Sequence, residues 1–478
     1  MILKDRLRNL IPGVHRVFCC LLVLASSGCA STPEIVYAPL EQSDYQSVTS
    51  AEQRSEFLKQ LSKHSSGQVC AQYRLLGKTA QQRPLEALLI KYRENEDQSR
   101  RKKMRILLMA SQHGNEISGC EALLIMAGNW VSGRNLSEWM KDAQILIIPA
   151  GNPDGIQNKR RVNAQGINLS TDYGLLAAPE STAVNNVLMA FEPHVVLDIH
   201  ESAILKKKSL GAQGWLTDVE AQFEYANNPN VNQSLQQFSS DVLLPEILKT
   251  VCDKGLRCNR YIGEITRTDQ FIRHGGLSAH NFRNKAGLLG SASFLLENRL
   301  DPSTGEYPTP RNIKERVRKQ MLSINAFLSV CAKNSDQLID VSEKARTTCA
   351  NTKTVWLQPE YTLNPASPFV EIPLRSISTG ELVTHRFEYH QKISKGPATD
   401  LAKSYRFNSH LDYFAQWLDK QGIPYASCRS NAGSQCIETE TNAINGCLLP
   451  LYLEKQSRSC VLERLPFCHD QACVKREP

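Results

Sequence analysis

Short apolar runs alternate with longer amphipathic stretches between residues 69 and 335, and this alternation is what most constrains the fold. Buried strands are expected at residues 85–90, 105–110, 145–150, 195–199 and 294–296. Helical stretches such as 116–126 and 313–330 lie between or after them. The order predicts an α/β domain whose central sheet is mixed, mostly parallel and flanked by helices.

The composition is that of a globular protein. Of 478 residues, 41 % are hydrophobic and 22 % are charged, which argues against a disordered chain. The formal net charge is +8, and part of it comes from basic residues that precede position 17. No nucleic-acid partner is expected from so modest an excess of positive charge.

The first 28 residues resemble an export signal. A basic segment ends at Arg16, an apolar run covers 17–25, and small residues precede Cys29. This ending is similar to a bacterial lipobox, in which the cysteine becomes the lipidated first residue. We therefore expect residues 1–28 to be a lipoprotein-type signal peptide, with Cys29 holding the chain to a bacterial membrane in the periplasm or at the outer membrane. Ordinary signal cleavage or a signal anchor are the alternatives.

The cysteines agree with an extracytoplasmic location. Twelve follow Cys29, and six of these lie in the last 51 residues, where an oxidising compartment would make them disulfides. A zinc knuckle is the rival interpretation, although no Cys-x-x-Cys occurs. Sequence cannot choose among the 15 possible pairings of six cysteines.

Changes in composition suggest the domain boundaries. We expect a tether over 29–66, a catalytic domain over 67–335, a linker over 336–354 and a small Cys-rich domain over 355–478. In that last domain, apolar residues at helical spacing follow Asn408 and Ser409, either of which can cap the helix, and Gly422 is expected to end it.

The chemistry begins at His113-Gly-Asn-Glu116, where a predicted strand turns into a helix. Such a turn can direct both side chains at one metal ion, but the motif alone is weak. His385 and Glu388 have the same spacing in a predicted strand, where residues three apart point to opposite faces. That second pair is not expected to share a metal.

What strengthens the first pair is the order of the motifs that follow it. Each lies at or just beyond the carboxyl end of a predicted strand, where open α/β sheets gather their sites. They are Asn152-Pro-Asp-Gly155, Arg161 to Tyr173, Asp198-Ile-His200 and Phe294-Leu-Leu-Glu297. Together with Leu75-Leu-Gly-Lys-Thr and Arg83-Pro-Leu-Glu-Ala, the series resembles the zinc carboxypeptidase family over residues 70–335.

The resemblance implies a role for each matching residue. His113, Glu116 and His200 are expected to ligate one Zn²⁺ per chain, Glu297 to be the general base, and Arg161 to polarise the scissile carbonyl. Physical chemistry agrees, since two imidazoles and one carboxylate leave zinc a fourth position for water. The expected activity is zinc-dependent hydrolysis of a peptide or amide bond near a C-terminus.

The pattern departs from the family where members that release a C-terminal residue show Gly-Val-Asp-Leu-Asn-Arg. This chain reads Gly166-Ile-Asn-Leu-Ser-Thr171, so Ser170 and Thr171 replace the pair that binds the substrate carboxylate. Hydroxyls at these substrate-binding positions cannot supply the charged grip of a guanidinium. Asn168 replaces an aspartate that orients a ligand histidine, and its amide oxygen can still accept that hydrogen bond.

These departures leave other interpretations open. No tyrosine lies shortly before Glu297, since Tyr261 is 36 residues away, and His274, His280 and Arg283 fall between them. The motif is also similar to the aspartoacylase and succinylglutamate desuccinylase group, so an acyl-amino-acid deacylase or a cell-wall peptide amidase is the first alternative. A catalytically inactive binding module on the same fold is the second.

Overall fold

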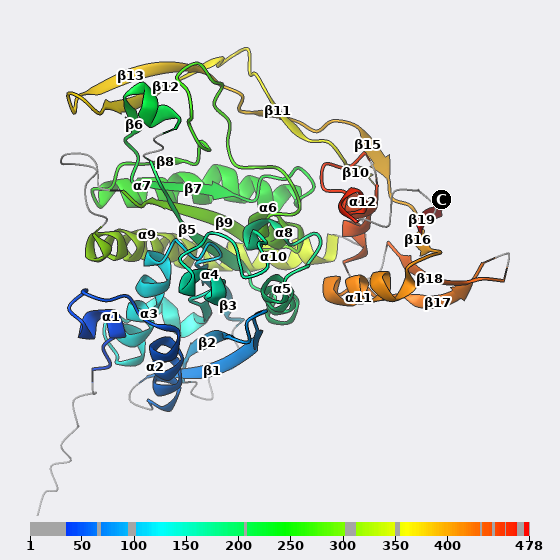
Figure 1. The fold of residues 1–478 in the computed structure, drawn as a ribbon, viewed down its shortest axis with the longest axis horizontal. Coiled ribbons are helices and arrows are strands. Elements are labelled where there is room, and N and C mark those ends of the chain that lie inside the picture. The colour runs from blue at the N-terminus through cyan, green and yellow to red at the C-terminus, as the bar shows by residue number, and fades with distance from the viewer. Residues whose placement is uncertain are drawn as a thin grey trace, which may run out of the picture.

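An eight-stranded sheet forms the centre of the computed structural model (Figure 1). The structure describes residues 35–64, 68–93, 102–204, 208–301, 312–348, 354–430, 433–441, 445–454, 456–465 and 473–477. The strand order is β1-β2-β4-β3-β5-β9-β7-β8, and β4, β3, β5 and β9 run parallel. The outer pairs β1–β2, β2–β4 and β7–β9 are antiparallel, which confirms the predicted mixed, mostly parallel sheet.

The five strands expected from apolar runs are all present; four are longer than predicted, and β4 begins and ends two residues earlier than predicted. The sheet consists of β1 (Val69–Lys78), β2 (Pro84–Tyr92), β3 (Met104–Ala110), β4 (Ala143–Ile148), β5 (Val195–Ser202), β7 (Ala221–Tyr225), β8 (Cys258–Arg260) and β9 (Ala292–Arg299). Ile106 and Leu108 of β3 pack into one core, whereas Leu107 and Met109 pack into another. Both faces of the central strands are therefore covered, which is why they read as continuous apolar runs.

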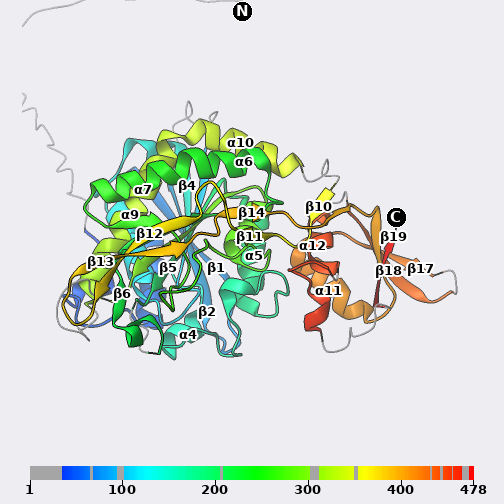
Figure 2. The same cartoon turned by 90° about the horizontal axis from the view of Figure 1, so that it is seen from above.

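Helices cover both faces of the sheet (Figures 1 and 2). The larger core lies beneath α2 (Ala51–Lys63), α3, α7, α9 and α10 (Ser335–Thr348), and the smaller core lies beneath α5 and α8. Their bounds are α3 (Ser118–Val131), α4 (Pro153–Gln157), α5 (Pro179–Phe191), α6 (Gln233–Gln237), α7 (Leu244–Asp253), α8 (Phe282–Leu288) and α9 (Ile313–Lys333). No helix in the described part of the chain is both long and apolar enough to cross a membrane.

Much of the segment expected to be a tether packs on the domain. Residues 35–63 include α1 (Pro39–Gln42) and α2 (Ala51–Lys63), and the side chains of Phe57, Leu58 and Leu61 are buried in the main core. Ser50 caps α2 by accepting a hydrogen bond from the Gln53 amide. The polar composition of 29–66 concealed a short apolar stripe on α2, so a free tether is wrong for this part.

The segment expected to be a linker, 336–354, is largely helical. Helix α10 (Ser335–Thr348) follows α9 almost directly, and Leu338 on it is fully buried in the main core. Arg346 donates hydrogen bonds to the carbonyls of Pro193 and Leu289. Polar residues cover the exposed face of this helix, which explains why the sequence looked like a linker.

The C-terminal region adds short strands and two helices. They are β10 (Thr354–Trp356), β11 (Glu360–Thr362), β12 (Phe369–Ser376), β13 (Leu382–Glu388), β14 (Lys392–Ser394), β15 (Ala398–Asp400), β16 (Ser404–Phe407), α11 (Leu411–Gln421), β17 (Ala426–Arg429), β18 (Gln435–Glu440), α12 (Leu449–Leu453) and β19 (Val474–Glu477). Gly422 ends α11 in the left-handed conformation, as predicted. The N-cap is His410, whose side chain does not cap the helix, so the expected cap by Asn408 or Ser409 is wrong.

Disulfides are present, as the cysteine content predicted. Cys428 pairs with Cys436, Cys447 is also disulfide-bonded, and Cys252 pairs with Cys258 in the catalytic unit. Cys460 is buried as a free thiol, so the expectation that all six C-terminal cysteines pair is wrong there.

A long arm returns from the C-terminal region over the catalytic unit (Figures 1 and 2). It consists of paired strands that end in the β12–β13 hairpin. β12 pairs with β6 (Trp215–Thr217), a strand of the catalytic unit. Two segments that are far apart in sequence thus share one three-stranded sheet.

Candidate metal centre

The turn after β3 positions the first two candidate ligands. Ser111 adopts a positive φ of 54°, and its hydroxyl donates a 2.7 Å hydrogen bond to the carbonyl of Glu116. Gly114 lies so close to Gly155 that an added Cβ would be 1.9 Å from the Gly155 carbonyl carbon. The turn is therefore closed on itself and pressed against the Asn152-Pro-Asp-Gly155 motif, which fixes where His113 and Glu116 point.

Three buried side chains converge at this turn. The Nδ1 atoms of His113 and His200 lie 3.0 Å apart, and each lies 2.9 Å from a different oxygen of Glu116. All three side chains are less than 5 % exposed. They form a group that can hold a metal ion, with ligand atoms within 4.8 Å of one another.

The second ring nitrogen of each histidine faces a different partner. Nε2 of His113 lies 3.0 Å from the amide oxygen of Asn168 and 3.0 Å from the Ser170 hydroxyl. Nε2 of His200 lies 3.0 Å from the carboxylate of Asp198. Both rings are therefore oriented with Nδ1 toward the shared centre, which is the support that metal-ligating histidines require.

The donor set fits zinc. Two imidazole nitrogens and one carboxylate are the ligands of a catalytic Zn²⁺ site, and they leave a fourth position free for water. Carbonyl- and carboxylate-rich cages, which Ca²⁺ and Mg²⁺ prefer, have no counterpart at these three residues. Burial lowers the pKa of His113, and this favours the neutral imidazole that binds a metal.

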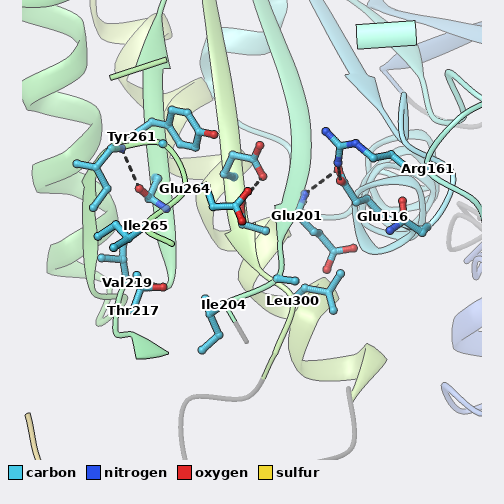
Figure 3. Close-up of a pocket in the computed structure, with 17 residues that line it drawn as sticks. Glu116, Arg161, Glu201, Ile204, Thr217, Val219, Tyr261, Glu264, Ile265 and Leu300 are labelled. Carbon is cyan, nitrogen blue, oxygen red and sulfur yellow. Dashed lines mark hydrogen bonds and ion pairs between the residues drawn. The ribbon is translucent and has the colours of Figure 1, made fainter. Parts of the chain in front are cut away.

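A pocket of about 480 Å³ opens beside the three ligands (Figure 3). Glu297, at the end of β9, lies directly beside His200 in the sheet register and accepts a 2.7 Å hydrogen bond from Ser202. Arg161 lies on the same side as Glu116 and is 3.1 Å from its carboxylate. Both residues line the pocket. The structure therefore brings the three predicted metal ligands, the predicted general base and the predicted carbonyl-polarising arginine to one place.

Tyr261 also lines this pocket, on the side opposite Arg161 (Figure 3). Sequence reasoning set it aside because 36 residues separate it from Glu297. Those residues loop away and return through α8, so distance along the chain concealed a shared site. Burial raises the pKa of Tyr261, so its hydroxyl stays protonated and can donate a hydrogen bond at neutral pH.

The pKa values of the two carboxyl groups at the site, Glu116 and Glu297, are shifted in opposite directions. Burial disfavours the charged form of Glu116, but hydrogen bonds from His113 and His200 outweigh it and hold its pKa below the usual range. Burial, with the Glu116 carboxylate nearby, raises the pKa of Glu297 to about 7. A carboxyl group with a pKa near neutrality is suited to accept and return a proton.

Other candidates lie elsewhere. The Ser170 hydroxyl contacts His113 and Asn168, Thr171 donates to the carbonyl of Asn168, and neither lines the pocket. Arg283 is buried and donates to Asn227 and to the carbonyl of Gly276. The structure therefore places the Ser170 hydroxyl behind a ligand histidine and the exposed Thr171 hydroxyl at the Asn168 backbone, whereas a substrate-binding role was predicted for both.

The second His-x-x-Glu pair is not brought to a common centre. His385 packs edge-on against Trp215, with ring centroids 4.4 Å apart, while Glu388 is exposed and contacts His390.

The predicted lipidation site, Cys29, lies outside the residues that the structure describes.

Comparison with known proteins agrees with this geometry. Residues 55–187 match the family model described as zinc carboxypeptidase. The predicted family resemblance is confirmed. Carboxypeptidase 2 of Trichophyton rubrum is 24 % identical over 282 residues, which cover 58 % of this chain and 50 % of that protein, and Carboxypeptidase 2 of Trichophyton tonsurans gives the same identity. The chain thus spans about half the length of these curated relatives.

Solved carboxypeptidase structures are also similar. A metallo-carboxypeptidase from Burkholderia cenocepacia is 18 % identical with a TM-score of 0.46, covering 59 % of this chain and 69 % of that one. Carboxypeptidase A from Helicoverpa armigera is 14 % identical with a TM-score of 0.44, covering 60 % and 74 %.

Proposed function

We propose that this chain is a zinc metallopeptidase that hydrolyses a peptide or amide bond near the C-terminus of its substrate. The observation that carries the proposal is the convergence of His113, Glu116 and His200 beside a pocket that also contains Glu297 and Arg161. Bound zinc would supply a water of lowered pKa and a Lewis acid for the carbonyl.

The protein residues then divide the chemistry. Glu297 accepts the proton of the attacking water on its carboxylate and returns it to the leaving nitrogen. Arg161, half exposed at the pocket wall, donates to the carbonyl oxygen as negative charge develops there. The Tyr261 hydroxyl, opposite Arg161, is placed to hydrogen-bond the substrate backbone.

A specific observation keeps the amidase or deacylase alternative open. Among the pocket-lining residues that the structure describes, Arg161 is the only cation. A free C-terminal carboxylate would therefore have no second guanidinium of its own, since Arg283 is buried among other partners. We infer that amidated or extended substrates are cleaved about as well as those with a free C-terminus.

The decisive experiment uses Glu297→Gln with a panel of peptides carrying free and amidated C-termini. The variant should retain zinc and substrate binding while turnover falls by about two to four powers of ten, the range of general acid–base catalysis. A chelator should abolish wild-type activity, and added zinc should restore it. Near-wild-type turnover of the variant, or activity that survives the chelator, would refute the proposal and favour another catalytic centre, whereas a zinc-loaded wild type without turnover would favour the inactive binding module.

We also propose that the protein is exported and held at a bacterial membrane by lipid on Cys29. The basic and apolar segments before Cys29 support this, and the disulfides Cys252–Cys258 and Cys428–Cys436 fit an oxidising compartment. Cys29→Ser should abolish labelling by a radioactive fatty acid and move the protein from the detergent phase into the aqueous phase in a phase-partition assay. Labelling that persists would refute the anchor.

A further inference from the structure

A line of buried polar groups leads away from the metal centre behind His200. The Asp198 carboxylate lies 3.0 Å from Nε2 of His200 and accepts a 2.7 Å hydrogen bond from the side-chain amide of Gln112. The carbonyl oxygen of that amide accepts a 3.0 Å hydrogen bond from the Tyr173 hydroxyl. Asp198, Gln112 and Tyr173 are each at most 3 % exposed, so water does not replace these contacts.

The chemistry of the groups allows only one arrangement. A carboxylate can only accept hydrogen bonds, so Gln112 must turn its NH₂ group toward Asp198. Its oxygen is then directed at Tyr173, whose hydroxyl donates to it. The amide is therefore held from both ends, and the Asp198 carboxylate is fixed in turn.

Tyr173 is itself anchored by the C-terminal unit. The side-chain amide of Gln421 on α11 donates to the carbonyls of Tyr173 and Gly174, at 3.3 and 2.8 Å. The indole of Trp417, on the same helix, donates to the Gly174 carbonyl at 3.0 Å. The line of buried polar groups thus ends at Tyr173, whose backbone lies at the contact between α11 and the catalytic unit.

We infer that Tyr173 and Gln112 are positioning residues of the metal centre. They hold Asp198 against Nε2 of His200 and so keep Nδ1 of that ring directed at the metal. This inference rests on the proposed function, because it concerns how the same site is held. By this inference the 166–173 segment and α11 both support metal binding, although neither contacts the metal directly.

The physical consequence of losing either residue follows from burial. Tyr173→Phe removes one hydroxyl and leaves the Gln112 oxygen without a donor, so the amide that donates to Asp198 is no longer held at its far end. Gln112→Met keeps the volume but removes both contacts. Gln112→Met frees Asp198 to move away from His200, and loss of such support behind a ligand histidine typically weakens metal binding about 10- to 100-fold. Tyr173→Phe has a smaller effect, because it leaves the hydrogen bond from Gln112 to Asp198 in place.

The experiment measures zinc affinity by competition with a chromophoric chelator, and separately the melting temperature of the zinc-free protein. Tyr173→Phe should weaken zinc binding about 3- to 10-fold and Gln112→Met about 10- to 100-fold. In the double variant, Tyr173→Phe should add nothing further, because its contact is already gone. The matched control is Tyr405→Phe, which removes another buried hydroxyl, bonded to Glu454, and should leave zinc affinity unchanged.

The outcomes separate the two proposals. Zinc affinity within twofold of wild type in both variants would overturn the inference and leave the proposed function intact. Equal weakening by Tyr405→Phe would also overturn it, because the effect would then be one of general stability. Failure of the wild-type protein to bind zinc would overturn the proposed function together with the inference.

Discussion

Lys285 offers a test of the contact between the two units that does not depend on catalysis. Its side chain lies on α8, is fully buried, and donates a 2.7 Å hydrogen bond to the Gln421 side chain of α11. The ring of Tyr452 lies 5.4 Å from its Nζ. The nearby His280 has its pKa lowered to about 4 by burial, so it carries no charge above pH 6.

The size of the effect follows from the pKa. Burial lowers the pKa of Lys285 to about 7, against about 10.4 in an unfolded chain. Below pH 7 the amine is charged in both states, and the folded state is less stable by about 5 kcal/mol for that charge, at about 1.4 kcal/mol per pKa unit. Between pH 7 and 10 the folded chain has lost the proton while the unfolded chain keeps it, so stability rises with pH.

Lys285→Met should therefore change sign with pH. At pH 6 the methionine avoids the buried charge but leaves the Gln421 oxygen without its donor, which costs about 1 to 3 kcal/mol. The net gain of about 2 to 4 kcal/mol corresponds to about 2 to 4 °C in melting temperature, since a chain of this size unfolds with about 1 kcal/mol/K of entropy. At pH 10 only the lost hydrogen bond remains, and the variant should melt about 1 to 3 °C below wild type.

The assay is differential scanning calorimetry of both proteins at pH 6, 8 and 10 at equal zinc and salt. Other groups titrate over this range in both proteins, so only the difference between them is interpreted. A variant that is less stable than wild type at all three pH values would refute the reasoning, because it would show that Lys285 does not carry a buried charge at pH 6.

Two more predictions test the parts of the chain that adjoin the site. Arg375 on β12 forms a two-point ion pair with Asp218, which lies between two pocket-lining residues. In steady-state assays Arg375→Met should therefore raise KM several-fold with little change in kcat. The control variant Arg386→Met on β13 should leave both KM and kcat unchanged. Leu338→Ala in α10 should destabilise the catalytic unit by about 2 to 5 kcal/mol in thermal unfolding, whereas an alanine in a true linker would have no effect.

The central sheet and the metal centre were accessible to sequence reasoning for one physical reason. Strands buried on both faces are continuous apolar runs, and the carboxyl ends of parallel neighbours meet at one edge. His113, His200 and Glu297 each follow such a run, so their order along the chain was enough to bring them together. No side-chain contact had to be known.

Local composition gave a wrong prediction for helices that pack on the domain through only one narrow apolar face. Helices α2 and α10 are polar around most of their surface, and only a few residues such as Phe57 and Leu338 enter the core. The positions of Tyr261 and Ser170 were not predicted for a different reason, which is that their contacts join segments that are far apart in sequence. Periodicity carries no information about which loop returns to the pocket or which hydroxyl lies behind a histidine.

The C-terminal region is best understood as a structural part of the catalytic unit. Strand β12 of the arm pairs with β6 in a separate three-stranded sheet, beside Thr217 and Val219 of the pocket, and α11 holds the backbone that carries Tyr173. These two contacts act on different steps, since the first shapes the pocket and the second supports a metal ligand. Perturbing the arm should therefore change KM, and perturbing α11 should change zinc affinity, so that the two effects can be separated in one set of variants even though both originate in the same C-terminal segment.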